Sequence, residues 1–389
     1  MVSLKIAILG TRGVPPSYGG FETMAAELGT RLIARGHEVS VYCRESPGRR
    51  VAEAPSSLTA GRLDDSKTGS TWNGIQRIVV PALHGHKYLE TVTHSFLSAL
   101  DAMRRDFDAV LVCNAANAFV LPLLRAARIP VAINVDGIER KRRKWNVLGR
   151  AVYTIGEAFS AGFASAVVAD AEVIDRYYRA QYGIQPVMIP YGADFPVEDD
   201  SDVLQRLGLK PRQYILYVSR FEPENNPLEV VEAYERQQLP GDAPPLVMLG
   251  KGLYAPDLVA ALHRHESAHV LFPGALYGQD YRTLQRNALI YVQATEVGGT
   301  HPAMIEAMAS GGMVLAHDTP ENREVGGDAV GYFQLRPAET LSGTISEMLS
   351  NSLKREEFRS RARGRAEARY SWEAVTDSYE RLFRGVAGG

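Results

Sequence analysis

A glycine-rich turn in the second half of the chain has the residue types of a phosphate site. Gly298 and Gly299 follow an apolar run at residues 288–292, which predicts a buried parallel strand. Pro302 stands where the next helix would begin, a position that tolerates its missing N–H. This order directs backbone N–H groups and the positive end of a helix dipole at an anion. The stretch therefore predicts a phosphate site, and an ordinary strand-to-helix turn is the competing interpretation.

Two charged residues also come directly after predicted strands. Arg220 follows a strand at residues 214–218, and its guanidinium could hold a diphosphate through two parallel hydrogen bonds. Asp136 follows a strand at residues 131–135 and could orient a hydroxyl or act as a base. Both have structural alternatives, because Arg220 could form an interdomain salt bridge and Asp136 could simply start a turn at Gly137.

The first strand, at residues 5–9, ends in a long loop with Gly19 and Gly20 at the start of the next helix. The loop lacks the spacing of a dinucleotide fingerprint, and Arg44 stands where a ribose-binding acid would end the second strand. This disfavours a nicotinamide-dependent oxidoreductase. The geometry suits a phosphate or a sugar that enters from a facing domain, and a purely structural loop is the alternative.

The sharpest run of charge in the chain consists of basic residues followed by tryptophan: Arg140, Lys141, Arg142, Arg143, Lys144 and Trp145. A solvated basic face is the usual explanation of such a run. Its tryptophan and its place near the expected cleft favour an anionic membrane surface or a lipid-diphosphate acceptor as the alternative. The net charge of −2 argues against nucleic acid as a partner.

Composition limits the class of protein. A chain of 389 residues is too long for a single compact core, so two domains are expected. Cys43 and Cys113 each end an apolar run and are expected to be buried thiols in a reducing compartment. No Cys/His cluster has ligand spacing, so no metal is expected. The start does not resemble a signal peptide and no apolar run approaches ~20 residues, so a cytoplasmic protein is expected.

Strand-like and helix-like segments alternate through the first half, which is typical of a parallel sheet covered by helices on both faces. Strands are predicted at residues 5–9, 38–43, 75–80, 109–113, 131–135, 166–169 and 187–189. Helices are predicted at residues 20–35, 89–104, 116–127, 145–163 and 173–182, and residues 45–73 form a long loop or a hairpin.

A connection at residues 190–212 separates this series from a second one, which places the domains at residues 1–192 and 193–371. Strands follow at residues 214–218, 246–249, 270–272, 289–292, 313–316 and 330–333. Helices follow at residues 225–237, 256–265, 279–287, 302–310, 338–350, 356–369 and 372–386. Two doubly wound halves imply a cleft at the carboxyl ends of their strands.

Three of these segments together resemble a GT-B glycosyltransferase, an α/β protein with two facing Rossmann-like domains. They are residues 18–23, Arg220 with residues 223–226, and residues 298–308. More narrowly, they resemble the rhamnosyltransferase-like branch of the large retaining family four, which acts in bacterial capsule and exopolysaccharide assembly. The resemblance runs from Ile6 to the last helix and implies that residues 372–389 pack back on the first domain.

The resemblance also implies roles for site residues. Arg220 would neutralise the leaving diphosphate, Asp136 would lie near the acceptor and the donor sugar, and Glu306 would hold the donor ribose or deoxyribose. Backbone near Phe272 and Gly274 would contact the base. The other donor-side residues would be Gly19, Gly20, Asn225, Gly298, Gly299, Thr300 and His301. The acceptor or membrane side would hold Arg140, Arg142, Arg143, Lys144 and Trp145.

Two positions depart from the wider family. Many relatives carry a glutamate where this chain has Gly298, and a lysine where it has Asn225. Glycine and asparagine are expected at these places within the narrower branch. Whether Glu296 takes over from the missing glutamate is left open at this point.

The resemblance implies transfer of a sugar, best L-rhamnose from dTDP-rhamnose, to a hydroxyl of a glycan or lipid-linked acceptor, with retention and without metal or cofactor. The enzyme would work in the cytoplasm, at the inner face of the plasma membrane. The alternatives are a nucleotide-sugar-binding or scaffold protein and a GT-B epimerase. A phosphorylase would need a lysine for pyridoxal phosphate, and Lys251 is the only candidate on the expected cleft.

Overall fold

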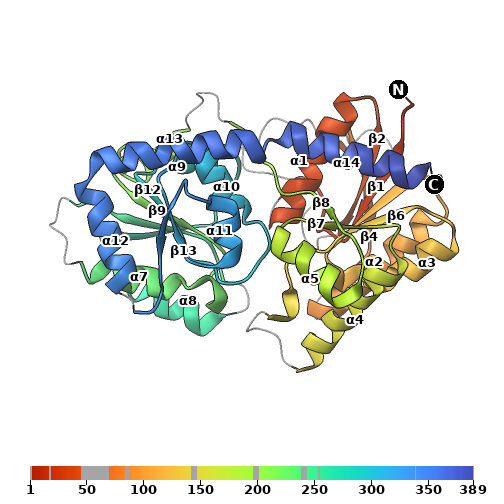
Figure 1. Cartoon of the computed structure of the whole chain (residues 1–389), viewed down its shortest axis with the longest axis horizontal. Helices are drawn as coiled ribbons and strands as arrows, with labels where there is room; N and C mark the ends of the chain where they lie inside the picture. Colours follow the sequence, from red (N-terminus) through yellow and green to blue (C-terminus); the bar gives the residue numbers. More distant parts are fainter. Residues whose placement is uncertain are drawn as a thin grey trace.

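The computed structural model describes residues 2–16, 19–44, 70–83, 87–141, 147–195, 201–237, 243–252, 255–337 and 339–388. These residues form two α/β domains that lie side by side, each built around one sheet (Figure 1). Within these ranges, no helix has both the length and the apolar character that crossing a bilayer would need.

The first domain contains an eight-stranded sheet in the order β3-β4-β2-β1-β5-β6-β7-β8. All strands are parallel except β3, which pairs antiparallel with β4. The chain adds strands on one side of β1 first, from β2 outward, and then on the other side, from β5 outward. Ligands bind at such a switch point in open α/β sheets. The strands are β1 (Lys5–Leu9), β2 (Glu38–Arg44), β3 (Thr71–Trp72), β4 (Ile75–Val80), β5 (Ala109–Cys113), β6 (Val131–Asn134), β7 (Ala166–Ala169) and β8 (Val187–Met188).

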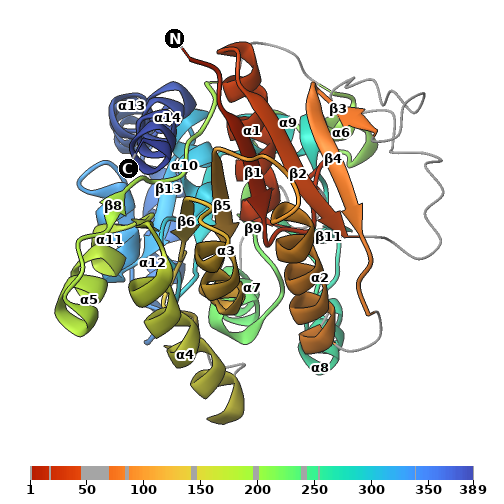
Figure 2. The ribbon, with the colours of Figure 1, turned by 90° about the vertical axis from the view of Figure 1, so that its right-hand side faces the viewer.

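Helices cover both faces of this sheet (Figure 2). One face carries α2 (Lys87–Ala102), the 3-10 helix η1 (Ala115–Val120), α3 (Leu121–Ala126) and α4 (Val147–Phe163). The other face carries α1 (Gly20–Ala34), while η2 (Glu139–Lys141) and α5 (Glu172–Tyr182) complete the domain. Helix α4 packs closely on η1, because a Cβ at Gly156 would collide with the carbonyl of Ala115.

The second domain contains a six-stranded parallel sheet in the order β11-β10-β9-β12-β13-β14. Its strands are β9 (Ile215–Val218), β10 (Leu246–Leu249), β11 (Val270–Gly274), β12 (Ile290–Gln293), β13 (Val314–His317) and β14 (Gly331–Phe333). Its helices are α6 (Val203–Arg206), η3 (Pro223–Asn225), α7 (Pro227–Glu235), α8 (Pro256–His263), α9 (Gly278–Asn287), α10 (Pro302–Ala309), α11 (Pro320–Gly326), α12 (Glu339–Ser350) and α13 (Ser352–Arg369).

The last helix, α14 (Trp372–Ala387), returns to the first domain and contacts α1, β5 and β6. The chain thus passes between the domains twice, and the two passages lie together. Ala193 forms a bridge with Ser371, and its N–H donates to the carbonyl of Tyr370 at 2.7 Å. Beside them Trp372 is buried against Gly192, where a Cβ would lie 2.5 Å from the indole ring.

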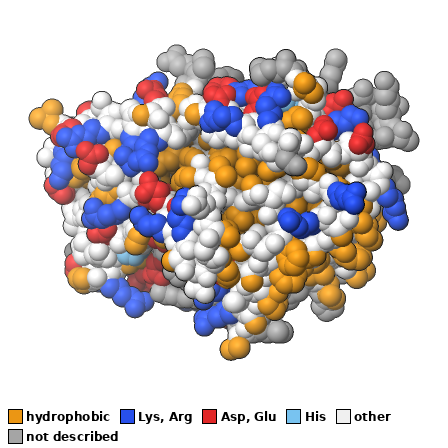
Figure 3. All heavy atoms as spheres, turned by 45° about the vertical axis from the view of Figure 1, so that its right-hand side comes forward, with side chains coloured by type: hydrophobic (Ala, Val, Ile, Leu, Met, Phe, Trp, Pro, Cys, Tyr) orange, Lys and Arg blue, Asp and Glu red, His pale blue; other side chains and the backbone are white. Residues whose placement is uncertain are grey.

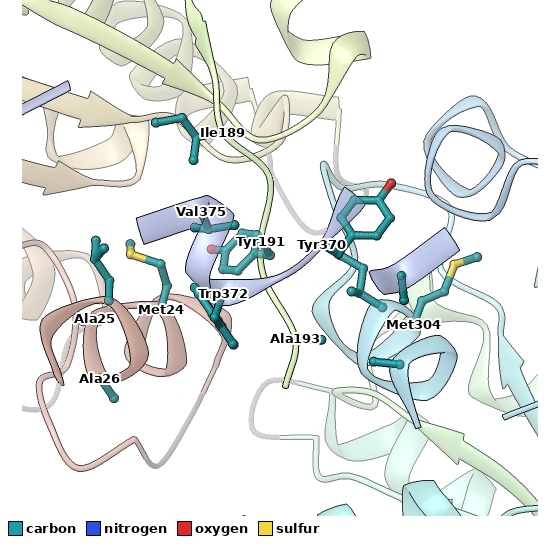
Figure 4. Close-up of a cluster of buried hydrophobic side chains, with 14 of the residues drawn as sticks. Met24, Ala25, Ala26, Ile189, Tyr191, Ala193, Met304, Tyr370, Trp372 and Val375 are labelled. Carbon is teal, nitrogen blue, oxygen red and sulfur yellow. The ribbon is translucent and has the colours of Figure 1, made fainter. Parts of the chain in front are cut away.

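A single buried cluster spans this crossing point (Figure 4). Met24 and Val375 lie on the side of the first domain, and Met304 lies on the side of the second. Tyr191 and Tyr370 come from the two passages themselves. The domains therefore share apolar packing in addition to their chain connections.

The predicted fold class is confirmed, and every predicted strand is present within one or two residues of its expected bounds. The predicted helix at 116–127 is divided, because the Asn114 side chain caps η1 and Pro122 begins a separate helix at its first turn. Helices α6 and α11 were not predicted. Cys43 and Cys113 are buried free thiols, as expected. The domain boundary at 192/193 stays a prediction, and most of the predicted loop at 45–73 lies outside the described residues.

Candidate active-site cleft

A cleft of about 1000 Å³ lies between the two domains. Its first-domain wall comes from the end of β2 and from the segments after β1, β4, β5 and β6, and its second-domain wall from those after β9, β10, β11 and β12. All of these segments lie at the carboxyl ends of parallel strands, so the carboxyl ends of the two sheets face each other across the cleft.

The cleft brings together most of the predicted site residues. Its lining includes both predicted catalytic residues, Arg220 and Asp136. It also includes the predicted donor-side residues Gly19, Gly20, Asn225, Gly298, Gly299, Thr300, His301 and Glu306. These residues come from four segments that are distant in the sequence, so the shared cleft is a property of the fold and not of any local motif.

Arg220 lies in a loop whose backbone is fixed by side chains. Asn225 donates from Nδ2 to the Arg220 carbonyl at 2.6 Å, and the Ser219 hydroxyl donates to the same oxygen at 2.8 Å. The buried Tyr217 hydroxyl donates to the carbonyl of Asn225 at 2.7 Å. Asn225 thus supports the loop that presents Arg220, at a position where the wider family would carry a cation.

Lys251 provides a further cation on the cleft. It follows β10, the strand next to β9, and lines the cleft together with Arg220. The two loops are joined, because the N–H of Phe221 donates to the Lys251 carbonyl at 3.1 Å. Two positive side chains therefore reach the cleft from adjacent strand ends.

Glu306 lies one turn into α10 and is held by a chain of hydrogen bonds. The Tyr281 hydroxyl donates to Glu306 Oε2 at 2.5 Å, and Gln285 Nε2 donates to that hydroxyl at 2.7 Å. Gln285 also donates to the carbonyl of Ala303 at 3.1 Å, which fixes the start of α10. Burial raises the pKa of Glu306 to about 7. The carboxyl group is therefore oriented and close to the midpoint of its titration at neutral pH.

Asp170 was not predicted and connects the two domains. It follows β7 and is buried, and its Oδ2 accepts the N–H of Thr300 at 2.7 Å. The Thr300 hydroxyl donates to the carbonyl of the same aspartate. Burial, and then the nearby Asp136, raise the pKa of Asp170 well above its usual range. Its position at a strand end was the signal that could have identified it.

This contact corrects one part of the phosphate-site prediction. The N–H of Thr300 was expected to face a donor phosphate, but it donates a hydrogen bond to the Asp170 carboxylate instead. A Cβ at Gly299 would collide with the Asp170 carboxylate, and a Cβ at Gly137 would lie 2.9 Å from the carbonyl carbon of Gly298. Gly299 in the second domain and Gly137 in the first therefore allow the domains to approach each other. We call the contact of Gly137, Asp170, Gly298, Gly299 and Thr300 the domain seam.

The backbone around Asp136 is constrained from the first domain. Asp136 has a φ of 55°, in the left-handed region, and its N–H donates to Asn134 Oδ1 at 3.0 Å. Asn134 in turn donates from Nδ2 to the hydroxyl of Tyr379 in α14 at 2.8 Å. The returning helix thereby helps to fix the loop that carries Asp136.

A second interdomain contact lies beside the seam. The carboxylate of Glu324, in α11, accepts the N–H of Glu172 at 2.5 Å and that of Val173 at 3.2 Å. These are N–H groups in the first turn of α5, which have no partner within their own helix. A side chain of the second domain therefore caps a helix of the first.

Several predicted residues do not line the cleft. The ring of Phe272 packs against Phe221 and His263, and the cleft wall after β11 comes instead from residues 275–278. Gly274 also lies outside the lining, as does Glu296, so the structure does not place Glu296 as a substitute for the missing glutamate.

The basic run is only partly described. Arg140 binds within its own domain, donating to the Tyr177 hydroxyl at 2.7 Å and pairing with Glu157 at 3.4 Å, and it does not line the cleft. Arg142, Arg143, Lys144 and Trp145 lie outside the described residues. Across the part of the chain that the structure describes, no group of three or more His, Cys, Asp or Glu side chains is placed to hold a metal ion.

Two protein-family models match the chain, one on each domain. The model described as Glycosyltransferase Family 4 matches residues 18–195, and the model described as Glycosyl transferases group 1 matches residues 201–365. No curated protein matches the sequence.

Solved structures share the fold over nearly the whole chain. A sucrose-phosphate synthase from Thermosynechococcus elongatus is similar with a TM-score of 0.80 and 18% identity, over 98% of this chain and 99% of its own. HepE from Anabaena in complex with UDP-glucose is similar with a TM-score of 0.74 and 16% identity, over 97% and 99%. An α,α-trehalose 6-phosphate synthase from Burkholderia multivorans gives 0.71 and 12%, over 100% and 98%. At these identities the likeness shows the fold alone.

The domain seam can be tested with Gly137→Ala. The added methyl group would meet the backbone of Gly298, which has no side chain to move aside, so the two domains have to separate. We expect a larger radius of gyration in small-angle X-ray scattering and a lower melting temperature. Gly343→Ala is the matched control, because a Cβ there meets nothing within 4 Å. An unchanged radius in both variants would contradict a tight seam.

The raised pKa of Glu306 predicts a pH-dependent stability. Its ordinary pKa of 4.5 rises to about 7 in the fold, so the folded state binds more protons between these values. Stability is therefore lost as the pH rises from about 4.5 to about 7. Glu306→Gln removes this loss, on the order of 2 kcal/mol after allowing for partial exposure.

The test is thermal unfolding of Glu306→Gln and wild type at a series of pH values. The difference in melting temperature should shift in favour of the variant as the pH rises through this window and then level off. Glu367→Gln, which changes an exposed carboxylate on α13, should show no such trend. Parallel curves for Glu306→Gln and wild type would show that the carboxyl group titrates normally.

Proposed function

We propose that this chain, a glycosyltransferase of the group 1 type with a GT-B fold, moves a sugar from a nucleotide diphospho-sugar to an acceptor hydroxyl. One observation carries this proposal: a single cleft holds Arg220, the start of α10 and Glu306 from the second domain opposite Asp136 of the first. The second domain then binds the donor, and the first receives the acceptor.

Fixed positive charge stabilises the leaving diphosphate in this proposal. Arg220 and Lys251 reach the cleft from adjacent strand ends, and the start of α10 adds the positive end of a helix dipole. Charge that is already in place when the glycosidic bond breaks does the work that a metal ion does in other transferases. We therefore propose a reaction without metal or cofactor.

The proposed transfer retains the configuration at the anomeric carbon. The bond from the anomeric carbon to the diphosphate breaks as the acceptor oxygen bonds on the same face, and a donor phosphate oxygen takes the hydroxyl proton. This scheme uses no enzyme nucleophile. Asp136 orients the acceptor hydroxyl, and Glu306 accepts hydrogen bonds from the ribose or deoxyribose. Two domains around one cleft also exclude water, which would otherwise hydrolyse the donor.

The best proposal for the donor is dTDP-rhamnose, with a glycan or a lipid-linked acceptor in bacterial polysaccharide synthesis at the cytoplasmic side of the membrane. It is supported by the glycine and asparagine at positions 298 and 225, which match the rhamnosyltransferase-like branch. The complex of HepE with UDP-glucose supports a UDP-sugar as the second choice.

The alternative is a protein that binds a nucleotide-sugar without transferring it. Gly298 and Asn225 favour this alternative, because many relatives carry a glutamate and a lysine at these positions. A GT-B epimerase is the other alternative, and it would convert the donor with no acceptor present. Donor binding without transfer or slow hydrolysis would indicate a binding protein.

The donor can be identified by thermal-shift measurements with dTDP-rhamnose, UDP-glucose, UDP-N-acetylglucosamine, GDP-mannose and NAD, each with and without Mg²⁺. A ligand that binds only the folded state raises its apparent stability. We expect one sugar nucleotide to raise the melting temperature equally with and without Mg²⁺, and NAD to have no effect. A shift with NAD alone would contradict the proposal.

The role of Arg220 can be tested by its replacement. Arg220→Ala should lower kcat by roughly 100- to 1000-fold, as when one donor to a developing negative charge is lost. Arg220→Lys should recover part of the rate, and Lys251→Ala should have a smaller effect. Arg264→Ala, at the exposed end of α8, is the control and should keep full turnover. Full turnover of Arg220→Ala on the identified donor would contradict the assignment.

A further inference from the structure

Two side chains of α9 determine how Glu306 presents its carboxylate to the cleft. Tyr281 and Gln285 lie one turn apart on this helix, and both line the cleft together with Glu306. The Tyr281 hydroxyl lies 2.5 Å from Glu306 Oε2, and Gln285 Nε2 lies 2.7 Å from the same hydroxyl. The three groups therefore form a chain of hydrogen bonds that ends on one oxygen of the carboxylate.

The direction of each hydrogen bond in this chain is fixed. Gln285 Nε2 also lies 3.1 Å from the carbonyl oxygen of Ala303, and a carbonyl can only accept, so this end of the side chain is the amide nitrogen. The nitrogen therefore donates to the Tyr281 oxygen as well. The single hydrogen of the Tyr281 hydroxyl is then directed at Glu306 Oε2. Gln285 is buried, which shields this arrangement from water.

The other oxygen of the carboxylate is available to a ligand. Among the residues that the structure describes, none donates a hydrogen bond to Glu306 Oε1. The Glu306 side chain is partly exposed, and it lines the cleft. An ionised carboxylate only accepts hydrogen bonds, so its ligand has to donate them. Glu306 therefore offers one oxygen, and not two, to a hydroxyl group in the cleft.

The surroundings of Glu306 favour a neutral hydroxyl over a phosphate. Burial raises the pKa of Glu306, and the carboxylates of Glu27 and Asp194, which also line the cleft, raise it further. The exposed Arg282 offsets these acids only in part. Elsewhere on the second domain, acidic and basic side chains are interspersed, as the left side of Figure 3 shows. An excess of acids at one end of the cleft repels an anion and accepts hydrogen bonds from a sugar.

The pentose of a nucleotide differs between donors in the number of its hydroxyl groups. Ribose carries neighbouring 2′ and 3′ hydroxyls, which together suit the two oxygens of one carboxylate, whereas deoxyribose carries the 3′ hydroxyl alone. Because Tyr281 occupies Oε2, Glu306 can satisfy one hydroxyl through Oε1 and leaves a second without an acceptor. A hydroxyl that leaves water without a new partner weakens binding.

We propose that Tyr281 makes the donor site selective for a 2′-deoxynucleoside diphosphate over the corresponding ribonucleotide. This inference rests on the proposed function, in which Glu306 holds the pentose of the donor. Tyr281 is a positioning residue, because it acts through Glu306 Oε2 and does not itself bind the pentose. The hydrogen-bond chain gives a reason to expect a dTDP-sugar that is independent of the glycine and asparagine at positions 298 and 225.

The selectivity can be measured on wild type with four nucleotides: UDP, 2′-deoxy-UDP, 5-methyl-UDP and dTDP. They differ only in the 2′ hydroxyl and in the methyl group of the base, so isothermal titration calorimetry separates the two contributions. We expect each deoxynucleotide to bind roughly tenfold more tightly than its ribonucleotide, with or without the methyl group. Equal affinities within both pairs, or tighter binding of the ribonucleotides, would overturn the proposal.

Tyr281→Phe removes one oxygen atom and makes Glu306 Oε2 available to the 2′ hydroxyl. The preference for the deoxynucleotide should then disappear. A purely structural role of Tyr281 would weaken binding of both members of a pair equally, and an unchanged preference would therefore contradict the proposal. Tyr234→Phe is the matched control and should keep the wild-type preference. Its hydroxyl, in the same domain, donates to the Pro244 carbonyl at 3.0 Å, and Tyr234 does not line the cleft.

The titrations belong at about pH 8.5, because the pKa of Glu306 is about 7 and the carboxylate is then ionised in wild type. Each preference is a ratio within one variant, so a general change in stability or charge cancels. Failure of all four nucleotides to bind wild type would contradict the proposed function, and this inference with it. Binding of all four without regard to the 2′ hydroxyl would contradict this inference alone.

Discussion

The close contact between the carboxyl ends of the two sheets determines the geometry of the cleft. Backbone meets backbone at Gly137 and Gly298, and the buried Asp170 holds the N–H of Thr300. These contacts help to place Arg220 and Asp136 on one cleft. The seam lies beside the proposed donor site, so the start of α10 is positioned by the other domain. Burial raises the pKa of Asp170 there, which is the electrostatic cost of placing a carboxyl group between two sheets.

Charge is distributed unequally between the two walls of the cleft. The second domain lines the cleft with Arg220, Lys251 and Arg282 against Glu222 and Glu306. The first domain lines it mainly with acids, and its charged lining residues are Glu22, Glu27, Glu90, Asp136 and Glu139 with Arg12 and Arg44. Asn225 and Tyr217 fix the backbone of the Arg220 loop. Glu306 is oriented in the same way by Tyr281. The Arg220 loop and the Glu306 side chain are thus held by hydrogen bonds within the second domain.

The fold could be predicted from the sequence because buried strands and amphipathic helices leave local patterns in it. The site could be predicted in part because a residue that directly follows a parallel strand lies at the edge of the sheet that faces the cleft. Arg220 and Asp136 were found in this way. Asp170 meets the same condition but belongs to no motif, so it was missed. The glycine turn at 298 and 299 was predicted to be a phosphate site, and the sequence could not show that Gly137 and Asp170 of the other domain lie against it. The ring of Phe272 packs against Phe221 and His263, and a contact of the backbone near it with a base stays a prediction.

The paired passages at Ala193 and Ser371 make the second domain an insertion within the first. The chain between these two residues leaves the first domain and returns to it at one place. After the return, α14 completes the core of the first domain. Recombination at the two adjacent passages could therefore replace the whole second domain and leave the strand order of both sheets unchanged. If the second domain binds the donor and the first the acceptor, as proposed, the two specificities could then diverge separately.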